Sequence, residues 1–332
     1  MKREVLNNIF EQFSKINVLV IGDVMLDAYT AGTVTRISPE APVPVVDIST
    51  RYNRLGGAAN VALNIKALGG NPIMCSVTGN NKQDTDFTDL MQNEGLSTHG
   101  ILPSSERILT VKHRIFGSKQ QLLRIDEEIT SPLSVQDEER FLTLLKQIID
   151  SHSIDVMIFE DYDKGVITPR IINEMVKISI AKNIPITVDP KKRNFLHYNN
   201  IAIFKPNLKE LQEGCKDLEQ ADLQLIIKQF MQEKQHQRLL LTLSEKGVLI
   251  CEKQGKDFVF EQIPAHVRNV ADVSGAGDTV ISVASLCLAT GMNFKEIATF
   301  ANLAGGLVCE EVGVVAIDKE KYINEILNVL SL

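Results

Sequence analysis

The sequence lacks several features that would assign it to a familiar class of protein. None of its apolar runs is long enough to span a bilayer, and the charged N-terminus has no apolar signal core. Its five cysteines are widely spaced and form no Cys-x-x-Cys pair, so neither a zinc site nor a disulfide framework is indicated. These absences predict a cytoplasmic protein with reduced thiols and no membrane partner.

Two widespread phosphate-binding motifs are also absent. No G-x-x-x-x-G-K-[ST] sequence occurs, so the chain has no Walker A loop. Gly275 and Gly277 do not form a dinucleotide fingerprint, because they lie late in the chain and Val280 occupies the position of the third glycine. An NAD-dependent oxidoreductase is therefore disfavoured.

The charge balance is mildly acidic. There are 35 lysines and arginines against 42 aspartates and glutamates, which gives a formal net charge of −7. This balance argues against nucleic acid or an anionic membrane as the main partner. It does not exclude an anionic small molecule, because a local cluster of lysines and arginines is enough to bind one.

What the sequence does contain is an alternation of apolar, strand-like runs with helical patterns. The runs lie at 18–21, 154–159, 186–189, 202–204 and 239–243, and the helical patterns at 57–68, 83–94, 134–150, 168–182 and 219–233. Such an alternation predicts an α/β fold around a mostly parallel sheet. Ligands of such sheets bind outside the carboxyl ends of the strands.

Two segments, about 28–50 and 107–126, break this alternation. The first is rich in valine, threonine and proline, and the second is typical of two strands joined by a turn. Neither suits a helical crossover. We expect both to form a small β-sheet lid over the ligand end, since long insertions there are often functional. Ordinary edge hairpins are the alternative.

A glycine-containing segment opens the first of two predicted buried helices, which lie at 275–290 and 294–311. Residues 274–279 read Ser-Gly-Ala-Gly-Asp-Thr. The free N–H groups of a helix start form an anion site, and Asp278 is positioned there to accept a proton from an attacking hydroxyl. The alternative is a first-turn carboxylate that is merely favoured by the helix dipole.

Residues 272–279 resemble the C-terminal signature of the PfkB, or ribokinase-like, carbohydrate kinases. Residues 56–69 resemble their N-terminal signature, so the resemblance covers nearly the whole chain. It implies one ribokinase-like three-layer α/β/α domain over residues 1–332, with a mostly parallel central sheet, a small β-sheet lid, ATP and Mg²⁺. It also implies a catalytic group of Asp278 as base with Gly275, Ala276 and Gly277 as the anion hole.

The resemblance further implies nucleotide contacts at Asn207, Glu210, Ser244, Gly247 and Asn302. Each has a structural alternative. Asn207 and Glu210 would also suit a helix capping box. The segment from Ser244 to Gly247 could be a plain β-turn, and Asn302 could simply bond within the fold.

Two residues are candidates for contact with metal ions. Glu210 would act on Mg²⁺ through water, since Mg²⁺ keeps several of its waters. Asp272 lies where some relatives have a monovalent-cation loop, and the sequence leaves open whether K⁺ binds there.

The acceptor side is implied by the same family. Asp27 would accept bonds from vicinal sugar hydroxyls, with Asp23 as a second carboxylate. Gly56, Gly57 and Asn60 would let the backbone approach the sugar and add an amide contact. Solvated loop carboxylates and helix N-capping are the competing interpretations.

Three further segments narrow the resemblance within the family. Residues 35–45, 120–126 and 161–165 resemble the members that phosphorylate the anomeric oxygen of D-glycero-D-manno-heptose 7-phosphate, a step toward ADP-heptose and the lipopolysaccharide core. The product would be heptose 1,7-bisphosphate. Candidate cations for the 7-phosphate are Arg36, Lys112, Arg114, Lys164 and Lys191. Any one of them could equally be a solvated surface charge.

Two rival functions stay open. The chain could be another PfkB-type kinase, acting on fructose, a hexose phosphate, ribose or a nucleoside. It could also be an inactive sugar- or nucleotide-binding regulator on the same fold, although the intact Asp278 and Asn207–Glu210 pair argue against this. The sequence departs from the family pattern at Lys205 and Ser274, where threonine is common, and at Glu160, where serine often precedes Asp-Tyr.

The chain ends at Leu332, soon after the last predicted kinase helix, and contains no H-x-G-H motif of nucleotidyltransferases. We therefore expect kinase activity alone, with adenylylation carried out by a separate protein. The apolar lid strands predict a homodimer, because an exposed sheet edge or face is otherwise a liability.

Overall fold

The computed structural model describes residues 3–330 except 119, 216–221 and 267. Its central sheet has nine strands in the order β13-β12-β11-β10-β9-β8-β1-β4-β5. Neighbours from β5 to β11 pair in parallel, and β12 and β13 are antiparallel. The strands are β1 (Asn17–Gly22), β4 (Asn71–Thr78), β5 (Ile101–Pro103), β8 (Val156–Glu160), β9 (Ile186–Asp189), β10 (Ile203–Phe204), β11 (Arg238–Thr242), β12 (Val248–Gln254) and β13 (Asp257–Ile263).

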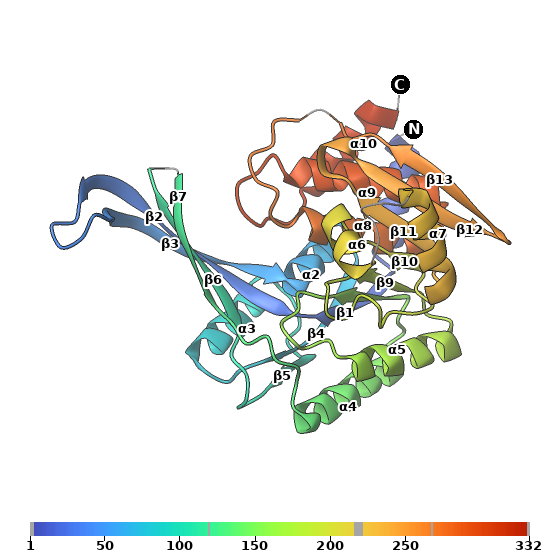
Figure 1. The fold of residues 1–332 in the computed structure, drawn as a ribbon, viewed down its shortest axis with the longest axis horizontal. Helices are drawn as coiled ribbons and strands as arrows, with labels where there is room; N and C mark the ends of the chain where they lie inside the picture. Colours follow the sequence, from blue (N-terminus) through green and yellow to red (C-terminus); the bar gives the residue numbers. More distant parts are fainter. Residues whose placement is uncertain (1–2, 119, 216–221, 267, 331–332) are drawn as a thin grey trace.

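Helices cover both faces of this sheet (Figure 1). In β1, Val18 and Val20 point into one core and Leu19 and Ile21 into the other, as expected for a strand buried on both faces. The first core holds α1 (Arg3–Phe13), α2 (Ala58–Ala67), α3 (Lys82–Asn93), α8 (Ala276–Ala289), α9 (Phe294–Val308) and α10 (Lys319–Leu330). The second holds α4 (Val135–Ser151), α5 (Pro169–Lys182), α6 (Leu208–Gly214) and α7 (Leu223–Lys234). The predicted three-layer α/β/α fold is confirmed.

A second sheet projects from the body of the molecule (Figure 1). Its order is β3-β2-β6-β7, formed by β2 (Val24–Ile37), β3 (Pro44–Gly57), β6 (Thr110–Gly117) and β7 (Gln120–Glu127). The predicted smaller sheet is therefore present. It is longer than expected at its inner end, because β2 starts two residues after β1 and β3 runs directly into α2. This continuity connects the second sheet to the ligand edge of the first.

The remaining differences from the predicted elements are local. The helix expected at 219–233 is α7, and part of that range lies outside the described residues. The helix expected at 294–311 ends at Val308. The β12–β13 hairpin was not predicted, since its strands mix polar and apolar residues and carry a weak pattern. Within the described ranges, no helix combines the length and apolarity needed to cross a membrane.

Candidate active site

The site is built around the first turn of α8. Its N-cap is Gly275, whose φ of 81° lies in the left-handed region that favours glycine. A Cβ atom there would lie 2.9 Å from the Nδ2 atom of Asn60. Gly275 therefore lets the helix start approach α2 closely and brings Asp278 against Asn60. The Ala276 N–H is already used, because it donates to the Val273 carbonyl at 3.3 Å.

Asp278 is buried, with 2% of its surface exposed. Its Oδ2 atom accepts a hydrogen bond from Asn60 Nδ2 at 2.7 Å, and its Oδ1 atom accepts one from the Tyr162 hydroxyl at 2.6 Å. Burial raises the pKa of Asp278 to about 6, while these two hydrogen bonds oppose the rise. Such a carboxylate is ionised at neutral pH and remains basic enough to take a proton.

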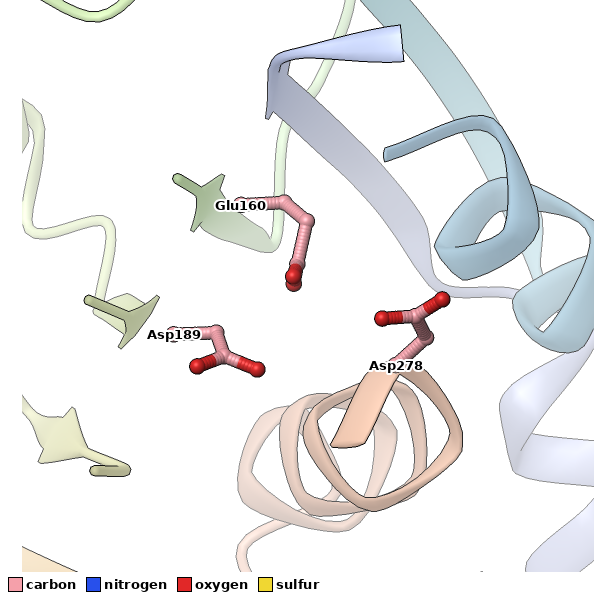
Figure 2. A group of neighbouring side chains, drawn as sticks. All are labelled: Glu160, Asp189 and Asp278. Carbon is pink, nitrogen blue, oxygen red and sulfur yellow. The ribbon is translucent and has the colours of Figure 1, made fainter. Parts of the chain in front are cut away.

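Two more carboxylates face Asp278 from the ends of neighbouring strands (Figure 2). Glu160 ends β8 and Asp189 ends β9, and one oxygen from each of the three groups lies within 4.8 Å of the others. Glu160 is fully buried. Burial first, and then Asp189 and Asp278, raise its pKa well above the ordinary value. The three strand and helix ends thus gather negative charge at the carboxyl edge of the sheet.

Two lysines counter this charge. The Lys205 ammonium lies 2.7 Å from Asp189 Oδ2, and Lys191 forms an ion pair with Glu210. Burial opposes the charge on Lys205, but Asp189 and its other acidic neighbours prevail and raise its pKa. Gly277 fits between these groups, since a Cβ atom there would lie 3.3 Å from Asp189 Oδ2 and 3.4 Å from Lys205 Nζ.

The acceptor candidates line the inner end of the second sheet. Asp27 forms an ion pair with Arg114, and Lys112 on β6 is paired with Asp27 in the strand register. A Cβ atom at Gly56 would come within 2.3 Å of Asp27 Oδ2, so glycine is needed there. The Lys112 ammonium lies 5.5 Å from the centre of the Tyr162 ring, which links this group to Asp278.

Asp23 has a different environment from Asp27. Its Oδ2 atom accepts the backbone N–H groups of Tyr162 and Lys164 at 2.9 and 3.1 Å, and its Oδ1 atom accepts that of Val166 at 3.0 Å. Both oxygens therefore hold the loop after β8. Gly57, with φ 60°, is the N-cap of α2 and packs against the Asp23 carbonyl. We interpret Asp23 and Gly57 as residues that hold the backbone around the site in place and do not contact the sugar themselves.

On the nucleotide side, Asn207 and Glu210 form the capping box of α6. The Asn207 side chain accepts the Glu210 N–H at 2.8 Å, and Glu210 Oε2 accepts the Asn207 N–H at 2.8 Å. The other Glu210 oxygen pairs with Lys191. With both oxygens engaged, Glu210 is better suited to contact a metal ion through water than as a direct ligand.

Ser244, Gly247 and Asn302 gather around the segment 263–265. A Cβ atom at Gly247, whose φ is 85°, would lie 2.1 Å from the Ile263 carbonyl oxygen. Ser244 begins the short 3-10 helix that this glycine ends. Asn302 donates to the Pro264 carbonyl at 2.9 Å. The structural alternatives, a turn and an internal hydrogen bond, are therefore realised at all three positions.

Three predicted site residues have other surroundings. Arg36 is exposed near the outer end of β2, about 30 Å along the strand from Asp27 at 3.3 Å per residue. Lys164 pairs with Glu128 at 2.8 Å. Asp272 accepts the N–H groups of Ser274 and Gly313, each at 2.9 Å, which holds the approach to α8. Arg36 in particular is not brought to the Asp278 cluster.

The sequence analysis gave no role to four residues at the centre of the site: Tyr162, Glu160, Asp189 and Lys205. A signal for three of them was available. Asp189 ends an apolar run that was predicted as a parallel strand, and Glu160 and Lys205 directly follow two other such runs. Polar residues at those points meet at one sheet edge. Tyr162 had no comparable signal, because its hydroxyl reaches Asp278 only through the turn after β8.

Comparison with known proteins agrees with this geometry. The model of the pfkB family of carbohydrate kinases matches residues 15–321. A bifunctional protein HldE from Citrifermentans bemidjiense is 35% identical over 328 residues, which cover 98% of this chain and 66% of that protein. HldE from Desulfatibacillum aliphaticivorans is 36% identical over 309 residues, covering 92% of this chain and 62% of that protein. The chain thus spans about two thirds of the length of these relatives.

Solved structures show the same fold at low identity. Phosphofructokinase-2 from Escherichia coli in complex with potassium aligns with a TM-score of 0.76 at 18% identity, covering 96% of this chain and 99% of that one. Ribokinase from Arabidopsis thaliana, complexed with ribose and ATP, aligns with a TM-score of 0.67 at 16% identity, covering 94% and 98%. With the family model matched over most of its length, the chain belongs to the pfkB family of carbohydrate kinases.

Proposed function

We propose that this carbohydrate kinase transfers the γ-phosphoryl group of ATP to the anomeric oxygen of D-glycero-D-manno-heptose 7-phosphate. The observation that carries the phosphoryl-transfer part is the buried Asp278 beside the glycine-lined start of α8. The choice of sugar is supported by residues 35–45, 120–126 and 161–165, which resemble heptose 7-phosphate kinases.

Asp278 acts as the general base in this proposal. It takes the proton of the anomeric hydroxyl, whose oxygen then attacks the γ-phosphorus while the bond to the leaving ADP oxygen breaks. Tyr162 and Asn60 keep the carboxylate oriented through their hydrogen bonds. The start of α8 at 275–277 offers a positive dipole end to the phosphoryl oxygens.

The sugar phosphate would lie between Asp27 and the cations of β6. Arg114 already pairs with Asp27 and is mostly buried, so it can orient the carboxylate toward sugar hydroxyls. Lys112 is largely buried, and burial lowers its pKa. An anionic substrate would offset that burial and pair with the ammonium. We therefore give Lys112 and Arg114 the main role in holding the 7-phosphate, with Lys191, whose ammonium lies 5.3 Å from the centre of the Tyr162 ring, as a further cation.

Membership of the family implies ATP and Mg²⁺. Bound beside the nucleotide phosphates, Mg²⁺ would neutralise charge that develops on the phosphoryl oxygens. The Asn207–Glu210 pair supports this position, because Glu210 lies at a helix start and its carboxylate can accept hydrogen bonds from metal-bound water. K⁺ near Asp272 and a cytoplasmic location remain parts of the proposal, the latter supported by five free cysteines.

The second sheet would act as the lid of this single kinase unit and as a dimer surface. Exposed apolar side chains on this sheet and its β2–β3 loop include Ile37, Val43, Ile48, Leu122, Leu123 and Ile125. Pairing with a second copy would cover them and bring the lid down over the sugar. Light scattering at working concentration should give the mass of a dimer, and a monomer mass would contradict this part of the proposal.

The activity is tested by coupled ADP detection with a panel of acceptors. Heptose 7-phosphate should give the highest kcat/KM, ahead of fructose 6-phosphate, fructose, ribose and nucleosides. A higher value for another sugar would assign the chain to a different PfkB-type kinase. Binding of a sugar with no phosphoryl transfer to any acceptor would favour the inactive-regulator alternative.

A further inference from the structure

The carboxylate oxygens of Glu160 and Asp189 are incompletely satisfied. Within the described residues, neither Glu160 oxygen has a hydrogen-bond partner, and neither does Asp189 Oδ1. Glu160 is 0% exposed and Asp189 is 4% exposed, so bulk water does not solvate them. Buried polar atoms in native proteins are almost always paired, which makes these oxygens an exception that calls for a ligand.

The charges around these oxygens do not balance. Four carboxylates, those of Glu160, Asp189, Glu210 and Asp278, share the edge with two ammonium groups, those of Lys191 and Lys205. When all four carboxylates are ionised, the four negative and two positive charges leave a net charge of −2. One divalent cation would neutralise the group.

We propose that Glu160 and Asp189 directly bind a divalent cation even in the absence of nucleotide. Two ligand oxygens on opposite sides of a cation are separated by twice the metal–oxygen distance, about 4.2 Å for Mg²⁺ and about 4.8 Å for Ca²⁺. Oxygens of Glu160, Asp189 and Asp278 fall within 4.8 Å of one another. Carboxylate oxygens are the ligands that such hard cations prefer.

Asp278 flanks this site without needing to be a ligand. Both of its oxygens already accept hydrogen bonds, from Asn60 and Tyr162, whereas those of Glu160 accept none from the described residues (Figure 2). A cation on Glu160 and Asp189 would therefore lie beside the base and the start of α8. This differs from a metal ion held through Glu210, whose oxygens are both engaged.

A proton on Glu160 is the competing explanation. A carboxyl group that holds a proton would normally donate it to a neighbouring oxygen. A carboxyl group that keeps its proton is not a metal ligand, because ligands must be deprotonated. Mn²⁺ binding that depends on Glu160 therefore separates the two explanations.

The test is a Mn²⁺ titration of the ligand-free protein, followed by the electron paramagnetic resonance signal of free Mn²⁺. The wild type should bind one Mn²⁺ per chain, displaced by Mg²⁺ or Ca²⁺. Glu160→Gln keeps the shape of the side chain and should weaken binding at least about tenfold. Glu160→Ser, which removes the carboxylate altogether, should do the same, and serves if the first variant is misfolded.

The control is Glu174→Gln, the same substitution on α5, where Glu174 pairs with Lys146 and Lys177 outside this group. It leaves both proposed ligands and should not change Mn²⁺ binding. The inference is overturned if the wild type binds no Mn²⁺, if both Glu160 variants bind as tightly as the wild type, or if Glu174→Gln loses as much affinity as Glu160→Gln. The inference rests on the proposed kinase function only for what the bound cation would do. The Mn²⁺ titration contains no sugar or nucleotide, so a failed acceptor assay would not change the result of the titration.

Discussion

Two groups of buried carboxylates lie at the same edge of the central sheet, and their surroundings differ. Asp23 and Asp161 have all their oxygens hydrogen-bonded. Asp23 accepts three backbone N–H groups, and Asp161 accepts from Asn194, Tyr198 and the Asp163 N–H. Glu160 and Asp189, one residue before Asp161 and at the end of the next strand, keep oxygens without partners among the described residues.

The comparison separates carboxylates that maintain the fold from carboxylates that are available for chemistry. Burial raises the pKa of Asp161 to about 7, so even a fully bonded carboxylate experiences the loss of solvent. What differs is hydrogen-bond capacity. Asp23 and Asp161 have used theirs on the N–H and side-chain donors around the loop 161–167, whereas Glu160 and Asp189 retain some of their own beside Asp278. Satisfaction of hydrogen bonds, more than burial, distinguishes the two carboxylates that we propose as cation ligands.

The largest expected effect is on turnover in Asp278→Asn. The amide cannot accept the hydroxyl proton, so kcat should fall by about 10²–10⁴-fold, the usual contribution of a general base. ATP affinity, measured by calorimetry, should change little. Near-normal kcat in this variant would remove Asp278 from the role of base.

The same variant should change how stability depends on pH. The folded pKa of Asp278, about 6, lies above the ordinary value of 3.8, so the folded state holds this proton more tightly than the unfolded state. The wild type should therefore lose up to about 3 kcal/mol of unfolding free energy through this group as pH rises from 4 to 7. Asp278→Asn has no such titration.

Urea denaturation of both proteins, in buffer with a metal chelator and without nucleotide, measures this difference. The stability of Asp278→Asn relative to the wild type should increase between pH 4 and 6 and then level off. A constant difference over that range would show that the buried carboxylate is not destabilised by its surroundings.

Asp23→Asn and Glu160→Gln test the comparison directly. In Asp23→Asn an amide group would face the N–H groups of Tyr162 and Lys164, so unfolding free energy should fall by about 2 kcal/mol. Glu160→Gln removes a buried charge that no hydrogen bond compensates, and in metal-free buffer it should leave stability unchanged or raise it by about 1 kcal/mol. Equal destabilisation by the two variants would refute the distinction.

The smallest effect is expected for Tyr162→Phe. This change removes the hydroxyl that donates to Asp278 and keeps the ring that lies near Lys112 and Lys191. Loss of one hydrogen bond corresponds to about 1 kcal/mol, so kcat should fall by less than about tenfold. Because that bond lowers the pKa of Asp278, the acid limb of the kcat/KM profile should move to higher pH. If the acid limb of the kcat/KM profile did not shift, the Tyr162 hydroxyl would have no influence on Asp278 and the residue would have a packing role only.

Much of the fold was predictable from local pattern. The apolar runs at 18–21, 186–189 and 239–243 became β1, β9 and β11 with small changes at their ends. Such runs are easy to recognise as strands because both faces of a strand in a parallel sheet are buried, which makes the run continuously apolar. The β12–β13 hairpin was not predictable in the same way, because it lies at the sheet edge, where polar and apolar residues mix.

The site was predictable only in part. Asp278 and Asn60 lie in short glycine-containing segments that can be recognised in the sequence. Their hydrogen bond joins a helix from the first quarter of the chain to a helix from the last quarter. Lys112 and Arg114 were proposed only as members of a cationic set, and the register of β6 against β2 places them opposite Asp27 and Tyr29. Arg36 belonged to the same set and lies far along β2.

The sequence by itself determined the layered fold and the two glycine-containing turns, and it singled out Asp278 as the candidate base. These depend on residues that are neighbours in the chain, where periodicity and backbone freedom act directly. Only the tertiary structure decided which acids are satisfied and which are not. That depends on how the ends of β8, β9 and α8 converge, because Glu160, Asp189 and Asp278 come from segments far apart in the chain.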